Sequence, residues 1–153
     1  MKITIFTDGA SRGNPGPGGY GVVMRYQNYR KELSGGFRKT TNNRMELLAV
    51  IEGLAALKKD GLEVTIYTDS RYVEQAVSKG WVFGWEKKNF SGKKNPDLWK
   101  RFLPLYRRHS VRFQWVKGHA GIAENERCDQ LATEAADRSE LPEDRGYEQQ
   151  SGS

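Results

Sequence analysis

Cysteine and long apolar runs are what this chain of 153 residues most clearly lacks. Its single cysteine, Cys128, cannot form an internal disulfide, and it leaves too few thiolates for a cysteine-rich zinc site. The first residues lead straight into an apolar alternation, so we expect no signal peptide, and no apolar stretch is long enough to predict a membrane span. These absences exclude a disulfide scaffold and an integral membrane protein, and they favour the reducing cytoplasm.

Acidic residues are scarce in the middle of the chain, and basic residues are scarce near its end. Residues 71–112 contain eleven Lys or Arg and three Asp or Glu, whereas residues 118–153 contain three Lys or Arg and nine Asp or Glu. Within a net charge of +6, this asymmetry indicates that a polyanion contacts the basic part of the surface. The acidic part is expected to stay away from the polyanion or to bind cations.

The hydrophobic pattern predicts three strands first and then an alternation of helices and strands. Strands are expected at 2–7, 20–26, 31–37, 63–68 and 111–116, and helices at 43–59, 70–78, 81–88, 97–108 and 124–136. The glycine- and proline-rich stretch 13–19 is expected to be a loop. Short links make the first three strands an antiparallel meander, and the later strands should lie parallel to one another.

These elements predict a single α/β domain with a mixed sheet flanked by helices, because the chain has the usual length of one domain. We place this domain at residues 1–138. The composition turns polar after Arg138, so residues 139–153 are expected to form a loose tail.

Two near-copies of one short phrase place a carboxylate at the expected end of a strand: Ile5-Phe6-Thr7-Asp8-Gly9 and Ile66-Tyr67-Thr68-Asp69-Ser70. If these strands are parallel neighbours, both acids emerge at one sheet edge, where open α/β sheets hold ligands. Glu46 and Asp129 lie on or beside the apolar faces of expected helices, where a charge needs a partner. Taken singly, each acid also suits a turn, a helix cap or the surface.

Four carboxylates gathered in one place repel one another unless a divalent cation neutralises them. Ligand sets made of oxygen atoms favour Mg²⁺ or Mn²⁺. Paired cations held by acids are a common device for in-line phosphoryl displacement. A basic groove beside such a site selects a nucleic-acid substrate, so the acids and the basic stretch point to the same chemistry.

Several motifs, spread from about residue 2 to residue 138, occur in an order typical of one known family. They are Thr7-Asp8-Gly9-Ala10, Gly13-Asn14-Pro15-Gly16-Pro17-Gly18-Gly19-Tyr20-Gly21, Thr40-Thr41-Asn42-Asn43-Arg44-Met45-Glu46-Leu47, Thr68-Asp69-Ser70, Trp115-Val116-Lys117-Gly118-His119-Ala120-Gly121 and Glu124-Asn125-Glu126-Arg127-Cys128-Asp129. With them the chain resembles type-1 ribonuclease H of the bacterial kind. The resemblance implies a five-stranded mixed sheet and a metal-dependent endonuclease that cuts the RNA strand of RNA/DNA hybrids, leaving 5′-phosphate and 3′-hydroxyl ends.

The resemblance also implies which residues carry the chemistry. Asp8, Glu46, Asp69 and Asp129 would bind two Mg²⁺ ions, for which Mn²⁺ can substitute. In this hypothesis one cation, held with the help of Asp8 and Asp129, lowers the pKa of the attacking water. The second, shared through Asp8, Glu46 and Asp69, stabilises the departing 3′-oxygen. His119, between two glycines, would assist proton transfer or product release.

A surface for the hybrid follows from the same resemblance. Contacts to sugars and base edges in the minor groove, where the 2′-hydroxyl can be sensed, fall to Asn14, Asn42 and Asn43. Lys39, Thr41 and Asn95 would bind a phosphate of the DNA strand. The DNA-side groove falls to Trp81 and Trp85, which at this helical spacing also suit a core, and the basic protrusion at residues 85–94 supplies Lys87, Lys88, Lys93 and Lys94.

Two departures from the family pattern predict weaker or altered substrate contacts. The basic protrusion looks short, and Phe90 stands where a tryptophan is common. Arg71 follows Asp69-Ser70 where a glutamine is frequent, so the contacts to the RNA strand are expected to differ.

Two other functions stay open on the sequence. Another nuclease or strand-transferase on the same scaffold would need neither the asparagine set nor the basic protrusion. A non-catalytic module that binds hybrids or duplex RNA would need neither the four acids nor His119. We expect a monomer with the hybrid as partner, no obligate protein partner and no membrane contact.

Overall fold

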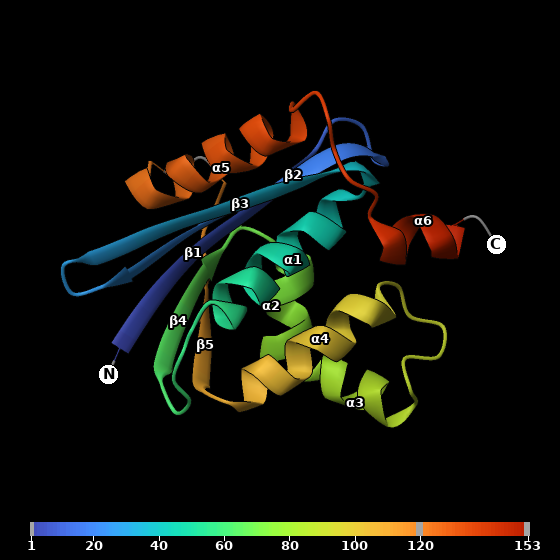
Figure 1. Ribbon diagram of the computed structural model, residues 1–153. Coiled ribbons are helices and arrows are strands. Elements are labelled where there is room, and N and C mark those ends of the chain that lie inside the picture. The colour runs from blue at the N-terminus through green and yellow to red at the C-terminus, as the bar shows by residue number, and fades with distance from the viewer. Residues whose placement is uncertain (1, 119–120, 152–153) are drawn as a thin grey trace.

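A computed structural model describes residues 2–118 and 121–151 (Figure 1). Within these ranges five strands form one sheet in the order β3-β2-β1-β4-β5. The strands β1 to β3 form an antiparallel meander, β4 lies parallel to β1, and β5 lies parallel to β4. The mixed sheet expected from the sequence is therefore confirmed. Its strands are β1 (Lys2–Ser11), β2 (Gly16–Tyr26), β3 (Tyr29–Thr40), β4 (Glu63–Thr68) and β5 (Ser110–Trp115).

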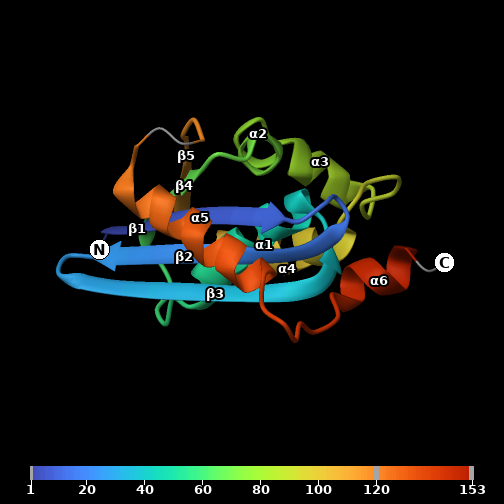
Figure 2. The ribbon, with the colours of Figure 1, turned by 90° about the horizontal axis from the view of Figure 1, so that it is seen from above.

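Helices cover both faces of the sheet. One face carries only α5, which packs across β1, β2 and β3, while α1 packs on the other face with α2, α3 and α4 around it (Figures 1 and 2). No helix in the described part of the chain is long and apolar enough to cross a membrane. The helices are α1 (Asn42–Ala55), α2 (Arg71–Ser78), α3 (Trp81–Lys87), α4 (Pro96–Arg107), α5 (Ala123–Ala136) and α6 (Arg145–Ser151).

The main hydrophobic core lies between the sheet and the α1 layer. Ile5, Ile66, Trp99 and Phe102 are fully buried there, and the Trp99 indole N–H donates to the Tyr72 hydroxyl at 2.9 Å, so its polar atom is satisfied. A second, smaller cluster lies under α5 and consists of Val23, Cys128 and Leu131. Burial raises the pKa of the Cys128 thiol, which makes this cysteine an inert part of the packing.

Several element boundaries differ from the expectation. The second strand begins at Gly16, inside the stretch expected to be a loop, because β1 runs on to Ser11 and pairs there with Gly18. Local composition does not reveal such a partner strand. The first helix ends at Ala55 and not at Lys59.

The segment after Arg138 differs most from the expected loose tail. Asp144 is only 7% exposed and accepts hydrogen bonds from the Thr40 hydroxyl at 2.7 Å and from Arg44 Nε at 2.9 Å. The helix α6 follows directly and lies beside the end of β3 (Figure 1). Asp144 therefore takes part in a buried ion pair with Arg44. The polar composition of this segment alone would predict solvated chain. The domain boundary at residue 138 stays our prediction.

Candidate functional site

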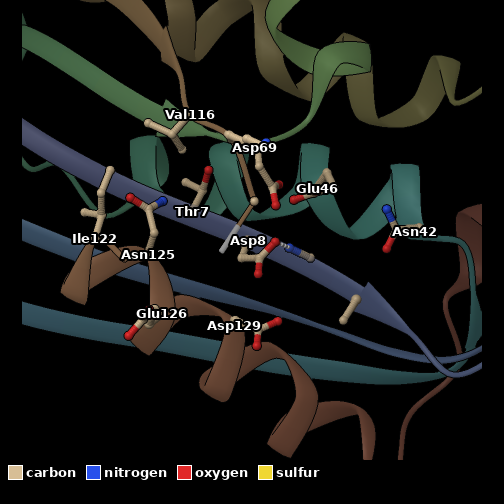
Figure 3. Close-up of a pocket in the computed structure, with 14 residues that line it drawn as sticks. Thr7, Asp8, Asn42, Glu46, Asp69, Val116, Ile122, Asn125, Glu126 and Asp129 are labelled. Carbon is tan, nitrogen blue, oxygen red and sulfur yellow. Dashed lines mark hydrogen bonds between the residues drawn. The ribbon is translucent and has the colours of Figure 1, made fainter. Parts of the chain in front are cut away.

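Asp8 and Asp69 come from the two central parallel strands. These strands are in register at Ile5 with Ile66, and Asp69 follows the last residue of β4. Asp8 does not end its strand as expected, because β1 continues along β2 to Ser11. The longer β1 therefore carries Asp8 alongside the point where β4 stops, and the two carboxylates face the same space (Figure 3).

Glu46 enters this space from α1. A Cβ atom at Gly9 would collide with the backbone of Glu46, so glycine at this position lets α1 lie directly on β1. Carboxylate oxygens of Asp8, Glu46 and Asp69 all lie within 4.8 Å of one another (Figure 3). Three of the four expected acids therefore form a compact cluster, one acid from each of three elements.

Asp129 reaches the same cavity from the opposite face of the sheet, on α5. It lines a cavity of about 260 Å³ together with the acids of the cluster, and Figure 3 shows it below Asp8. It lies near enough for its charge and a hydrogen bond to act on Asp8. The structure thus brings all four acids to one cavity, with Asp129 outside the compact group of three.

Burial makes this group of acids costly to ionise. Desolvation raises the pKa of Asp8 to about 8, and the charges of Asp69 and Asp129 add to the effect. The backbone N–H of Gly9, which donates to Asp8 Oδ1 at 2.9 Å, opposes it only in part. Burial and the charges of Asp8 and Asp69 also raise the pKa of Glu46 well above its ordinary value. Near neutral pH Asp8 and Glu46 therefore hold protons unless positive charge arrives.

The donor set fits a divalent cation. Glu46 Oε1 and Asp69 Oδ1 are buried and have no hydrogen-bond partner among the described atoms. Oxygen atoms of this kind are ligands that Mg²⁺ and Mn²⁺ prefer. Lys117 also lines the cavity, but it is exposed and forms no ion pair with the acids in the described part of the chain. A bound cation would satisfy both orphaned oxygens.

Sequence reasoning missed Asn125 in this cavity. Asn125 lies one turn before Asp129 on α5, and its Oδ1 is buried without a partner among the described atoms (Figure 3). The spacing of four residues within the motif that holds Asp129 could have placed both side chains on one helix face. His119, the residue expected to carry protons, lies outside the described residues, while its neighbour Gly118 lines the cavity.

One of the three predicted asparagines lines this cavity, and the other two line a second pocket. Asn14 Oδ1 accepts a hydrogen bond from the backbone N–H of Asn42 at 3.1 Å, which ties the β1–β2 loop to the start of α1. Asn42 also lines the acid cavity. Asn43 is exposed on the next position of α1 and lines a second pocket. The asparagines therefore connect the two hollows.

The second pocket contains most of the residues expected to hold a phosphate. Thr41 caps α1 by accepting from the backbone N–H of Arg44 at 3.2 Å, and Asn95 precedes α4 in a left-handed conformation with φ 61°. Both residues line the pocket beside Lys94. Lys39 is exposed on β3 and is not among the described residues that line it.

The two tryptophans of α3 differ in exposure, and the sequence left open whether they line the surface or the core. Trp81 is 46% exposed, while Trp85 is half-buried and packs its ring against Trp99 at a centroid distance of 5.9 Å. Lys93 Nζ lies 5.3 Å from the centre of the Trp85 ring, so the basic loop covers that ring. Phe90 is buried in the core and offers no surface contact.

The basic protrusion carries cations with no acidic partner nearby. Four lysines on it are exposed, and the described residues form no ion pair with any of them: Lys87, Lys88, Lys93 and Lys94. Arg71, the other departure from the family pattern, stacks its guanidinium on the Trp115 ring at 3.5 Å. Trp115 in turn donates its indole N–H to the carbonyl of Asp69 at 3.1 Å. Arg71 thus packs on Trp115, which hydrogen-bonds to the backbone of Asp69.

Comparisons with known proteins agree with this geometry. The RNase H family model matches residues 1–137. The chain is 59% identical over 148 residues to the ribonuclease H of Desulforamulus reducens, which covers 94% of this chain and 92% of that protein. This degree of identity over almost the whole length establishes family membership.

Solved structures give the same result for the fold. LC9-RNase H1, a type 1 RNase H with the type 2 active-site motif, superimposes with a TM-score of 0.80 at 34% identity, over 88% of this chain and 72% of that one. LC11-RNase H1, solved in complex with an RNA/DNA hybrid, superimposes with a TM-score of 0.63 at 28% identity, over 88% of this chain and 96% of that one.

Proposed function

The chain belongs to the RNase H family, and on this premise we propose that it is an endonuclease that hydrolyses the RNA strand of RNA/DNA hybrids. The observation that carries the proposal is the acid cavity, in which carboxylates from β1, α1, the end of β4 and α5 converge. Two buried carboxylate oxygens there have no hydrogen-bond partner among the described residues. The solved complex of LC11-RNase H1 with a hybrid supports the choice of substrate.

We infer that Asp8, Glu46, Asp69 and Asp129 hold two Mg²⁺ ions, with Mn²⁺ as a possible replacement. When bound there, divalent cations neutralise the acids, acidify the attacking water and stabilise the departing 3′-oxygen. Asp8 and Glu46 must release protons before they can serve as ligands, because burial raises the pKa of both carboxyls. Activity should therefore rise with pH toward the pKa of Asp8.

The residues around the cavity would position the hybrid. Asn42 lines the acid cavity, and Asn14 and Asn43 line the second pocket. From these positions the three asparagines would contact the minor groove and sense the 2′-hydroxyl. The second pocket, with Thr41 and Asn95, would take a phosphate of the DNA strand, and exposed Lys39 would lie beside the path of that strand.

The remaining contacts and the proton carrier follow the same proposal. Trp81 and Trp85 would border the DNA strand, and the four lysines of the basic protrusion would contact phosphates. His119 would carry a proton to or from the reacting oxygens, or help the product leave. A monomeric enzyme in the cytoplasm completes the proposal.

A cleavage assay on three labelled duplexes tests this function. We expect the protein to cut the RNA strand of an RNA/DNA hybrid only when Mg²⁺ is present, and to leave duplex RNA and duplex DNA intact. The product ends are read by phosphatase sensitivity, which should reveal a 5′-phosphate. Equal cutting of duplex DNA would instead indicate another nuclease on this scaffold, and tight hybrid binding without cutting would indicate a binding module.

A further inference from the structure

The second pocket has a wall that comes from the C-terminal segment. Its volume is about 410 Å³, and Tyr147 of α6 lines it together with Thr41, Asn43, Lys94 and Asn95. We propose that Tyr147 is a substrate-contacting residue whose hydroxyl donates a hydrogen bond to a DNA-strand phosphate held in this pocket. The inference rests on the proposed function, because it adds a residue to the binding surface of that site.

The chemistry of the lining suits a phosphate. Lys94 contributes a positive charge, Asn43 and Asn95 contribute amide groups, and no acid is present among the described residues that line the pocket. A neutral phenol adds a hydrogen-bond donor to such a set without adding a charge. Neutral side-chain donors of this kind, tyrosine included, make many of the phosphate contacts that fix a protein's register on a nucleic acid.

A buried ion pair fixes Tyr147 in its place. Asp144 accepts from Arg44 Nε at 2.9 Å and from Arg44 Nη2 at 3.0 Å, and Arg44 is only 2% exposed. The backbone N–H of Tyr147 donates to the carbonyl of Asp144 at 3.1 Å, which starts α6 directly from the ion pair. One turn of backbone therefore separates Tyr147 from an anchored carboxylate.

Arg44 also contacts Asn95, another residue that lines the pocket. Its Nη1 donates to Asn95 Oδ1 at 3.2 Å and to Asp97 Oδ1 at 2.9 Å. A Cβ atom at Gly146 would collide with Asp97 and Arg44, so the glycine before Tyr147 lets α6 rest directly on this network. The Asp144 anchor of α6 and Asn95 thus share one guanidinium, and their separation is set before any ligand enters.

Steady-state cleavage of a hybrid tests the contact with a conservative change. Tyr147→Phe keeps the ring and removes only the donor, so we expect KM to rise about threefold to tenfold while kcat stays within about twofold. Tyr29→Phe is the matched control, because Tyr29 is 56% exposed at the start of β3, and that end of the sheet lies far from α6 (Figure 1). Matching urea midpoints verify that both variants fold.

A scan with methylphosphonates in the DNA strand separates a direct contact from a structural role. Replacing one phosphate at a time should reveal a position where the unmodified protein loses affinity and where Tyr147→Phe loses clearly less. Additive losses at every position, or an unchanged KM, would overturn the role of Tyr147 while leaving hybrid cleavage established. If the unmodified protein does not cleave a hybrid at all, the proposed function fails, and the role of Tyr147 fails with it.

Discussion

Two buried charges lie two residues apart on α1, and the protein treats them in opposite ways. Arg44 is 2% exposed and Glu46 is 5% exposed. Arg44 meets Asp97 at 2.7 Å and Asp144 at 2.9 Å, so its charge is balanced within the chain. Glu46 meets Asp8 and other acids, and no basic side chain forms an ion pair with it in the described part of the chain.

The pKa values of the partners follow this difference. Burial opposes ionisation of Asp97, yet hydrogen bonds and the charge of Arg44 outweigh it and lower the pKa of that carboxyl. Burial raises the pKa of Asp8 to about 8, and the neighbouring acids add to it. A balanced cluster stabilises the fold, while an unbalanced cluster stores repulsion that an external cation can relieve. Changes to the two clusters should therefore affect different measurements.

Asp69→Asn should break the function of the unbalanced cluster with the largest effect. The change keeps the shape but removes the charge from a carboxylate whose Oδ1 is buried without a partner among the described atoms. We expect kcat on a hybrid in Mg²⁺ to fall below about 1%, which corresponds to about 3 kcal/mol or more of lost transition-state stabilisation. Asp60→Asn is the control, since that side chain is 77% exposed. Activity above a few per cent would reject the assignment of Asp69.

Arg44→Met should damage the balanced cluster and unfold the protein more easily. It leaves the Asp144 carboxylate, whose side chain is 9% exposed, without its cation. We expect the free energy of unfolding in urea to fall by about 2–3 kcal/mol, because removing one partner of a buried ion pair leaves the other charge uncompensated.

Arg101→Met provides the comparison for that variant. Arg101 pairs with Glu52 at 3.2 Å, but its side chain is 53% exposed, so the loss should stay within about 0.5–1 kcal/mol. Similar losses for both variants would show that the Arg44 cluster contributes no more than a surface pair.

The sequence predicted the unbalanced cluster far better than the balanced one. Asp8 and Asp69 follow short patterns of strand residues, and parallel pairing of those strands brings the acids together. Asp144 lies 100 residues from Arg44, in a stretch whose polar composition is typical of solvated chain. Only the folded chain reveals that this polar residue has a buried partner, and Tyr147 was missed for the same reason.

Element boundaries show the same limit on a smaller scale. Local periodicity predicted the five strands and the helices α1 to α5, because apolar spacing is a local property, but it did not predict α6. It could not predict that β1 extends past Asp8 to Ser11, because that extension depends on pairing with β2. The placement of Asp129 next to Asp8 likewise depends on α5 packing across the sheet.

Replacing the four protrusion lysines extends the comparison to exposed charges. Alanine at Lys87, Lys88, Lys93 and Lys94 should weaken hybrid binding about tenfold at low salt and lower the slope of log affinity against log salt by up to about 3. The value of kcat at saturating hybrid should not change, because none of these lysines is among the residues that line the acid cavity. A set with the same charge change serves as control: Lys2, Lys31, Lys58 and Lys59. An unchanged slope would show that the protrusion does not touch the nucleic-acid backbone.

Asp8→Asn should stabilise the metal-free protein, although it removes activity. The folded-state pKa of Asp8 is about 8 against an ordinary value of 3.8, so between these pH values the native carboxyl keeps a proton that the unfolded chain has lost. The free energy of unfolding of the unmodified protein therefore falls as pH rises through this range. Asparagine does not titrate, and it also removes the negative charge that repels the Glu46 carboxylate. We expect a gain of about 0.5–2 kcal/mol in chelator.

The pH and metal dependence of that gain distinguish repulsion from better packing. Repulsion predicts almost no gain below about pH 4, where Asp8 is protonated in both states, and the full gain above about pH 8. Added Mg²⁺ should shrink the gain, because the cation stabilises only the native state that keeps all its ligands. Urea midpoints at low and high pH, each with chelator and with Mg²⁺, measure all three effects, and Asp60→Asn should show none of them. Equal midpoints for Asp8→Asn and the unmodified protein in chelator at high pH would contradict the prediction. They would mean that burial and the neighbouring acids do not make the ionised Asp8 carboxylate unfavourable.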